Sequence, residues 1–200
     1  MKVMRKLEGE INKEVGFKVG DQVHVGKHYT ATCQKVGKNG AIFMFDQYLN
    51  EAKVMNHQRT NEGGYEASDL RKFLKGFAMN SMFDEIREMM VPFKNTGDLL
   101  RIPTAEEVFG PEEAHEYYET LSNKKQWELM KDRHNRIAFR GEDQGFEWGL
   151  LQNKYKESAD NFANVNTNGD ANYYDASGFY GVRVVFRLVE GENIDEEIFK

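Results

Sequence analysis

The sequence is poor in cysteine, in proline and in long apolar runs. Its single cysteine, Cys33, has no second cysteine to pair with, so no disulfide can form within the chain and nothing implies an oxidising compartment. No apolar run approaches the roughly 18 residues of a membrane span. Residues 1–8 carry charge without an apolar stretch, so we expect neither membrane insertion nor a signal peptide. There are only three prolines, and no proline-rich or serine-rich linker divides the chain.

Basic residues are also fewer than acidic residues. The 27 lysines and arginines are outnumbered by 33 aspartates and glutamates, which gives a net charge of −6. A nucleic-acid groove needs dense lysine and arginine to neutralise phosphates, so we expect no nucleic-acid partner. The hydrophobic fraction of 40% and the aromatic fraction of 12% exclude intrinsic disorder. A chain of 200 residues can bury roughly 70% of its unfolded surface, which predicts one domain with its own core.

Strand patterns occupy both ends of the chain. Residues 17–26 alternate apolar with polar side chains, 29–36 form a second candidate strand, and 41–45 form a short buried one. The glycines and asparagine at 37–40 are typical of a hairpin turn. Near the other end, residues 182–188 alternate cleanly, with Val182, Val184, Phe186 and Leu188 on one face.

Helix patterns occupy the middle. Leu70, Phe73, Leu74 and Phe77 share one helical face, and Ser68 stands at the N-cap position. Residues 82–90 repeat this helical spacing of apolar residues, and Ser81 and Asp84 have the spacing of a capping box at its start. Residues 104–107 are a capping box for a third helix, Pro111 can open a fourth, and 123–130 can form a fifth. The β–α–β order without regular repeats favours an α+β fold over a doubly wound sheet. We therefore expect a single domain at 17–188, an N-terminal extension at 1–16 and an acidic tail at 189–200.

No catalytic or metal centre stands out. His24 and His28 are four residues apart near Cys33, but their segment has a strand pattern and lacks the glutamate of a helical zinc site. Residues 164–175 partly match a calcium loop, with Asn164 at its first position, and an asparagine turn explains the same pattern. No serine lies in a nucleophile elbow. The carboxylate pairs at 106–107 and 112–113 fit helix starts, where they complement the helix dipole. We expect no catalytic residue, no metal and no cofactor.

The stretch from 153 to 180 is rich in asparagine and tyrosine and has no sustained period, so it is predicted to be a long loop region. Long loops in compact domains are often functional. Tyrosine offers rigid contact area and asparagine offers adaptable hydrogen bonds, and both suit the faces and hydroxyls of sugars. An ordinary polar loop over the sheet is the alternative. The candidate ligand-binding residues are Tyr155, Asn164, Asn166, Asn168, Asn172, Tyr173, Tyr174 and Tyr180.

Five short motifs in order carry a resemblance. They are the helix Y-x-x-S-x-L-R-x-x-L at 65–74, the T-x-E-E segment at 104–107, the tryptophan strand at Trp148, the V-x-x-x-G loop at 165–169 and the G-V-R strand at 181–183. Together they resemble an uncharacterised domain family of gut bacteria and their phages. That family is similar to the C-type-lectin-like fold of phage tail adhesins and of variable proteins diversified by retroelements. The calcium motifs of true C-type lectins are absent.

The resemblance implies a C-type-lectin-like fold and a non-enzymatic ligand-binding module. It implies a phage or prophage virion protein that recognises a host-surface receptor through the 153–180 stretch, with display in many copies or as a homo-oligomer. It also implies that Trp148 is a core anchor under the loops, and that Arg183, on the polar face of its strand, holds loop carbonyls. The alternative is a capsid or tail decoration protein whose loops contact other virion subunits. The related formylglycine-generating enzymes need a cysteine pair, which this chain lacks.

Overall fold

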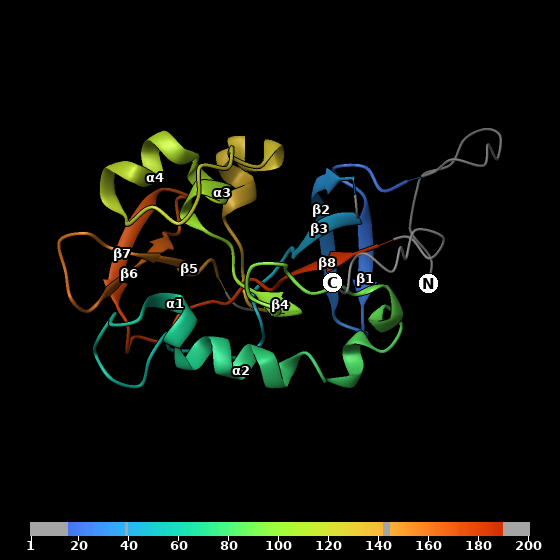
Figure 1. Ribbon diagram of the computed structural model, residues 1–200, viewed down its shortest axis with the longest axis horizontal. Helices are drawn as coiled ribbons and strands as arrows, with labels where there is room; N and C mark the ends of the chain where they lie inside the picture. Colours follow the sequence, from blue (N-terminus) through green and yellow to red (C-terminus); the bar gives the residue numbers. More distant parts are fainter. Residues whose placement is uncertain (1–15, 39, 142–144, 190–200) are drawn as a thin grey trace.

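Two antiparallel sheets lie at opposite ends of the molecule (Figure 1). The structure, a computed structural model, describes residues 16–38, 40–141 and 145–189. Apart from Gly16 and Val189, the predicted extension and tail lie outside these residues, as does Asn39 of the predicted turn. Short helices cover the smaller sheet on both sides, which confirms the α+β class. Across the described part of the chain, no helix is both long and apolar enough to cross a bilayer.

The larger sheet has the order β1-β2-β3-β8-β4, and every pairing in it is antiparallel. Its strands are β1 (Gln22–Val25), β2 (Tyr29–Gly37), β3 (Gly40–Phe45), β8 (Val185–Leu188) and β4 (Leu100–Arg101). The predicted hairpin is confirmed, because Gly37 pairs with Gly40 across the β2–β3 turn. The stretch before Pro103 joins the sheet through two residues of β4.

The main hydrophobic core fills one face of this sheet. Phe43 and Phe186 stack there at 5.8 Å between ring centroids, and Phe45 and Phe83 complete the aromatic cluster. The alternation predicted at the C-terminal strand is confirmed: Val182, Val184, Phe186 and Leu188 all belong to this core. Burying large aromatic side chains supplies most of the favourable free energy of such a sheet.

The first helices are α1 (Gly64–Ala67) and α2 (Asp69–Phe77). Ser68 caps α2 as predicted, because its hydroxyl accepts a hydrogen bond from the Arg71 amide at 3.1 Å. The helix predicted at 82–90 is wrong. Two 3-10 turns, η1 (Ser81–Phe83) and η2 (Arg87–Met89), stand in its place, and Asn80 caps the first of them. The two separate turns still place the side chains of Phe83 and Ile86 in the core, although no continuous helix forms.

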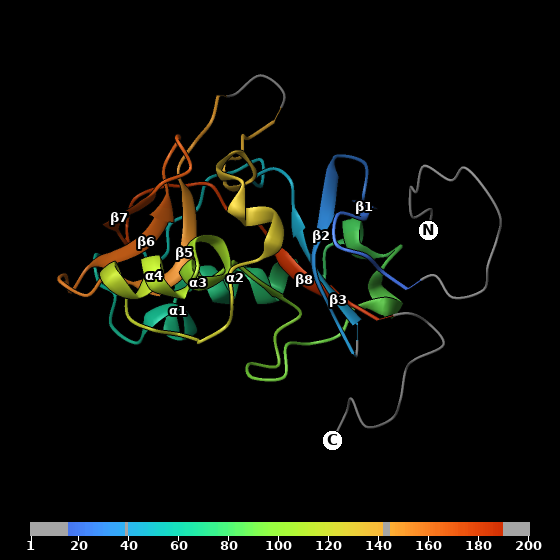
Figure 2. The ribbon, with the colours of Figure 1, turned by 90° about the horizontal axis from the view of Figure 1, so that it is seen from above.

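Two further helices lie over the smaller sheet. The capping box that opens α3 (Ala105–Phe109) is confirmed, with both of its hydrogen bonds formed. Pro111 begins α4 (Pro111–Tyr117) as predicted. The fifth predicted helix is instead the 3-10 turn η3 (Glu128–Lys131), followed by η4 (Arg133–Arg136). Figure 2 shows these yellow turns between the two sheets, and η3 contacts both β2 and α3.

Two of the three strands of the smaller sheet occupy the stretch that was predicted to be a loop, and the first begins in the predicted tryptophan strand. The strands are β5 (Gly149–Lys154), β6 (Asn161–Val165) and β7 (Ala171–Asp175). Alternation was hard to see because one face carries asparagine and tyrosine where a core strand has aliphatic residues. The opposite face carries Leu151, Ala163 and Val165, which pack against α3 and α4 in a second core.

A tyrosine ring joins the two sheets. Gly149 at the start of β5 forms a parallel bridge with Gly181, just before the return to β8. The ring of Tyr48 lies against both glycines, and its hydroxyl donates a hydrogen bond to the Glu147 carbonyl at 3.2 Å. Neither glycine has room for a side chain, so this contact fixes how the sheets meet.

We expect Gly149→Ala to lower the free energy of unfolding by about 1–3 kcal/mol, the usual cost of overpacking a filled core. The new Cβ would lie 2.4 Å from the Tyr48 hydroxyl oxygen. Urea unfolding followed by circular dichroism measures the change. Gly76→Ala in α2 is the matched control, because nothing lies within 4 Å of its Cβ and alanine favours a helix. An unchanged midpoint for Gly149→Ala would contradict the close packing described above.

Candidate functional site

An open groove of about 440 Å³ lies beside the smaller sheet, and we call it the aromatic groove. Five aromatic side chains form most of its wall, and three polar side chains complete it. The aromatic residues are Phe146, Trp148, Tyr174, Phe179 and Tyr180, and the polar residues are Arg140, Glu147 and Thr167. Its volume falls within the range of small-ligand sites, roughly 300–1,000 Å³.

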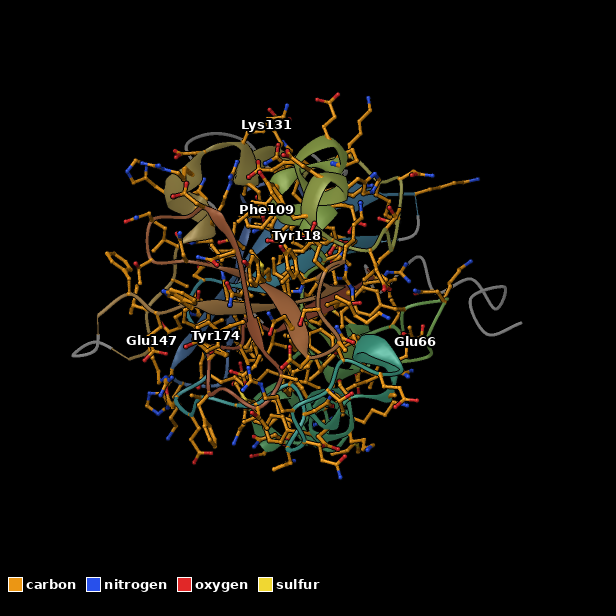
Figure 3. The ribbon with its side chains drawn as sticks, turned by 90° about the vertical axis from the view of Figure 1, so that its left-hand side faces the viewer. Glu66, Phe109, Tyr118, Lys131, Glu147 and Tyr174 are labelled. Carbon is orange, nitrogen blue, oxygen red and sulfur yellow. The ribbon has the colours of Figure 1, made fainter. Side chains whose placement is uncertain are left out.

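The sheet register explains why these rings meet. Asn164 on β6 is paired with Leu150 on β5 and with Asn172 on β7, so the three side chains share one face. Tyr174 is two residues from Asn172 and therefore lies on that face too. Trp148 stands just before β5 and contacts Tyr174, which places both at the same surface. In Figure 3, Tyr174 and Glu147 lie together, whereas Phe109 and Tyr118 lie above the sheet near α3 and α4.

Three of the rings form a contact cluster. The centroids of Trp148 and Tyr174 are 5.6 Å apart in an edge-to-face contact. Tyr180 stacks on Trp148 at 6.4 Å and meets Tyr174 at 5.4 Å. Phe179 and Phe146 extend the surface outward, and they are 71% and 61% exposed. Because water-exposed phenylalanine is costly, exposed aromatic surfaces of this kind are typical of ligand-binding sites.

Polar groups lie at the edge of the aromatic groove. Arg140 and Glu147 form an ion pair. Their neighbours Phe139 and Phe146 form an antiparallel bridge, which brings the two charged residues together. The Nε of Arg140 is buried and has no hydrogen-bond partner among the described residues. Burial raises the pKa of the Tyr180 phenol, and Asp175 and Tyr174 add to the shift. Its hydroxyl therefore stays protonated at neutral pH and can donate to a ligand.

Asn164 lies on the same face of the sheet as Tyr174. Asn164 is 1% exposed, and neither amide atom has a hydrogen-bond partner within the described part of the chain. It stands on the central strand β6, between Leu150 of β5 and Asn172 of β7. Most buried amides in proteins are paired, so an amide with both atoms free needs a specific explanation.

Two of the predicted ligand-binding residues lie on the other side of the sheet. Tyr173 pairs with Ala163, which faces α3 and α4, and Tyr155 packs against the same core. Their rings stack on each other at 3.8 Å and 10°. The hydrogen bond with Tyr173 is the main cause that raises the pKa of Tyr155 to about 12. Tyr155 and Tyr173 are therefore a separate pair, outside the aromatic groove.

The remaining asparagines of the prediction serve the backbone. The Asn166 side-chain oxygen accepts hydrogen bonds from the amides of Asn168 and Asp170, at 2.8 and 3.0 Å, and so forms the β6–β7 turn. The Asn172 side-chain oxygen accepts from the Tyr173 amide at 2.8 Å. The turn explanation of the calcium-like pattern agrees with these bonds. Of the eight predicted residues, Tyr174 and Tyr180 line the groove, and Asn164 shares the sheet face of Tyr174.

Both predicted anchors differ from expectation. Trp148 is half-buried in the groove wall, and the tryptophan of the interior is Trp127, which is 3% exposed. Arg183 is buried and does not lie on a polar strand face. It donates to the carbonyls of Phe45 at 2.9 Å and of Asn135 at 2.9 Å, which belong to β3 and η4. Arg183 therefore connects the larger sheet to the turn η4 and holds no carbonyl of the 153–180 stretch.

Sequence reasoning missed Phe146, Phe179, Arg140, Glu147 and Thr167 as groove residues. One signal was present: Phe146 is two residues before Trp148 in the predicted tryptophan strand at 146–151, so the two side chains share a face. Phe179 had no comparable signal, because it stands in the turn after β7 with no periodic neighbours.

The cysteine and histidine side chains considered as other candidate sites do not come together in the structure. Cys33 is buried, which raises the pKa of its thiol to about 11, so it is protonated at neutral pH. His24 and His28 are exposed. No three histidine, cysteine or carboxylate side chains within the described ranges lie close enough to hold a metal ion.

The carboxylates of α3 are structural. Burial opposes ionisation of Glu106, but hydrogen bonds from the Asn153 side chain and from the Leu121 amide outweigh it and lower its pKa. Glu107 closes the capping box and pairs with Arg101.

The model of one protein family, "Domain of unknown function (DUF6273)", matches residues 39–189. The chain belongs to the DUF6273 family. The matched range opens at the β2–β3 turn and includes β3 to β8, so every residue of the aromatic groove lies within the DUF6273 domain. No curated protein and no solved structure matches the chain.

Proposed function

We propose that the DUF6273 domain is a non-enzymatic ligand-binding module and that its aromatic groove binds a glycan of a bacterial surface. The observation that carries the proposal is the convergence of Trp148, Tyr174 and Tyr180 from three separated segments, extended by the exposed Phe146 and Phe179. Such a surface binds ligands that present both C–H faces and hydroxyl groups.

Physical chemistry favours a sugar over a purely apolar ligand. Aromatic rings carry negative charge on their faces and pack against the weakly positive C–H groups of a pyranose. The groove also offers a carboxylate and a guanidinium in Glu147 and Arg140, and the protonated phenol of Tyr180. These groups can hydrogen-bond hydroxyls that an aliphatic ligand lacks. An open groove binds weakly, so display in many copies would supply the avidity.

The wider setting belongs to the same proposal. The order of motifs that resembles the phage and gut-bacterial family supports a C-type-lectin-like arrangement, a virion protein and a receptor on the host surface. Four of the eight groove residues, Thr167, Tyr174, Phe179 and Tyr180, belong to the 153–180 stretch through which that resemblance implies ligand contact.

Fluorescence of the two tryptophans gives a direct test. Trp127 is buried and Trp148 stands in the groove, so a bound ligand should shield Trp148 from acrylamide quenching. The probes are chitooligosaccharides and polysaccharide extracted from bacterial cell walls. We expect saturable protection for the wild type. Tyr174→Ala/Phe179→Ala should weaken binding about 10–100-fold, as expected when two central aromatic contacts are lost.

The chain supplies a matched control for this experiment. Tyr155→Ala/Tyr173→Ala removes two stacked tyrosines from the opposite face of the same sheet, and it should bind like the wild type. No binding of any glycan by the wild type would overturn the proposal, as would equal losses in both variants. If the wild type binds no glycan but forms an oligomer, and Tyr174→Ala/Phe179→Ala dissociates that oligomer, the alternative function is favoured. The protein would then be a decoration protein that contacts neighbouring subunits.

A further inference from the structure

A second cavity is larger than the aromatic groove. A cleft of about 930 Å³ lies between the β2–β3 hairpin, the 93–98 segment and the 119–124 segment, and we call it the basic cleft. Its floor includes Ile42 and Arg187, which lie on the face of the larger sheet opposite the main core. In Figure 3, Glu66 of the basic cleft and Glu147 of the aromatic groove lie at opposite sides of the molecule.

Charge distinguishes the basic cleft from the rest of the surface. Seven lysine and arginine side chains line it against four carboxylates, although acidic residues outnumber basic ones in the whole chain. The basic residues are Lys35, Lys38, Lys94, Arg101, Lys124, Lys154 and Arg187. Walls of one sign concentrate the field in a concave site and attract ligands of the opposite charge.

Three of the four carboxylates are already neutralised. Glu107 receives both terminal nitrogens of Arg101, at 2.6 and 2.7 Å. Asp98 pairs with Arg71 at 2.6 Å and with Lys75 at 3.3 Å, two cations that do not line the cleft. Glu119 pairs with Lys154 at 2.9 Å. The remaining carboxylate is that of Glu66.

The lysines at the rim of the basic cleft differ from these carboxylates, because they are not neutralised by ion pairs with described residues. Lys35, Lys38, Lys94 and Lys124 form no ion pair with any described residue, and they come from three separate segments around the opening. Deeper in the wall, the Arg101 guanidinium lies 4.5 Å from the Phe93 ring centre, and this packing holds it in place. Burial and the neighbouring charge of Arg101 lower the pKa of Arg187. The positive charge of the rim is thus not balanced within the described residues.

We propose that the basic cleft binds a short anionic ligand with two or more phosphate or carboxylate groups. Lysine ammonium groups on flexible stems are suited to phosphate and carboxylate oxygens at varied spacing. The net charge of −6 disfavours a long polyanion that would continue past the cleft, so the ligand is a small molecule or a chain end. The site is independent of the aromatic groove and does not rest on glycan binding there.

Calorimetric titration with two probes tests the proposal and separates the two chemistries. Tripolyphosphate represents phosphate ligands and trigalacturonate represents carboxylate ligands. We expect at least one of them to bind the wild type, with affinity that falls as salt is added. Lys94→Glu/Lys124→Glu should weaken that binding about tenfold or more, because it removes two rim cations and adds two anions. Both lysines are exposed, so the fold should tolerate the change.

The matched control is Lys72→Glu/Lys131→Glu, which alters net charge by the same amount at exposed sites away from the basic cleft. It should bind the probe nearly as well as the wild type. Equal weakening in both double variants would overturn the proposal, because it would show attraction to overall charge and no defined site. Failure of the wild type to bind either probe at low salt would overturn it as well. Thermal unfolding of each variant confirms that the titrated protein is folded.

Discussion

Glu107→Leu is expected to lower the free energy of unfolding by about 3–5 kcal/mol, the usual cost of leaving one partner of a buried ion pair alone. The side chains of Arg101 and Glu107 are 9% and 3% exposed, so water cannot replace the lost partner. Glu107 also accepts a hydrogen bond from the Thr104 amide at 3.0 Å, so the variant loses one half of the capping box of α3. Urea unfolding of the full chain measures the change.

A double-mutant cycle separates the pair from its surroundings. Arg101→Met/Glu107→Leu replaces both charges with apolar groups of similar volume, and we expect it to cost far less than the two single changes together. The Met side chain can still pack on the Phe93 ring that the guanidinium now covers. If the single and double variants lose stability additively, the charge pair is not the source of the effect, and loss of packing or of the cap explains it.

The sequence pattern predicted the larger sheet well because alternate side chains of its strands face the main core. Phe43 and Phe45 on β3, and Phe186 on β8, point to the same core, whereas their neighbours Met44 and Val185 belong to a separate cluster on the opposite face. The caps at Ser68 and Thr104 were also predictable, since each needs only one hydroxyl at a fixed spacing from the first turn. Local rules of this kind do not depend on the rest of the fold.

The smaller sheet could not be predicted in this way. Its β6 and β7 strands carry Asn161, Asn164 and Asn172, and asparagine is more typical of turns than of strands. The pairing partners, the helices α3 and α4 on one face, and the aromatic cluster on the other together override that preference. Tertiary context of this kind is absent from any short window of sequence.

The candidate site was predicted in part for the same reason. Residue type indicated that tyrosines between 153 and 180 were available for contact, but the faces on which they lie depend on the register of β7. Adjacent residues of a strand point to opposite faces, so Tyr173 and Tyr174 cannot serve one surface. Phe146 precedes the predicted stretch and Phe179 lies near its end, and only the folded chain brings them to the groove.

Asn164→Val is expected to raise the free energy of unfolding by about 1–3 kcal/mol, because it removes a buried amide that has no partner among the described residues. Valine is also favoured in a central strand such as β6. A buried substitution usually destabilises, so a gain at this position would be a distinctive result. Thermal and urea unfolding of the variant and the wild type give the comparison.

Asn164→Asp is the complementary variant, with nearly the same shape. Its carboxyl would be buried without a cation, so the folded state would favour the protonated form and raise the pKa of the carboxyl. The unfolded chain releases the proton near pH 4, so the variant should lose stability as the pH rises above about 4. A pH-independent difference between Asn164→Asp and the wild type would show that water reaches this position.

The Val variant also tests why the chain keeps an unpaired amide. Replacements that stabilise a protein often remove function, because binding sites retain groups that only a ligand satisfies. We therefore expect Asn164→Val to unfold later than the wild type and to bind the glycan of the aromatic groove more weakly. Asn164 lies on the same face of the sheet as Tyr174, so we expect its amide to hydrogen-bond a ligand that enters beside this ring. A stabilised variant with unchanged affinity would assign Asn164 to the structure of the sheet alone, and the groove would then bind through its rings and rim.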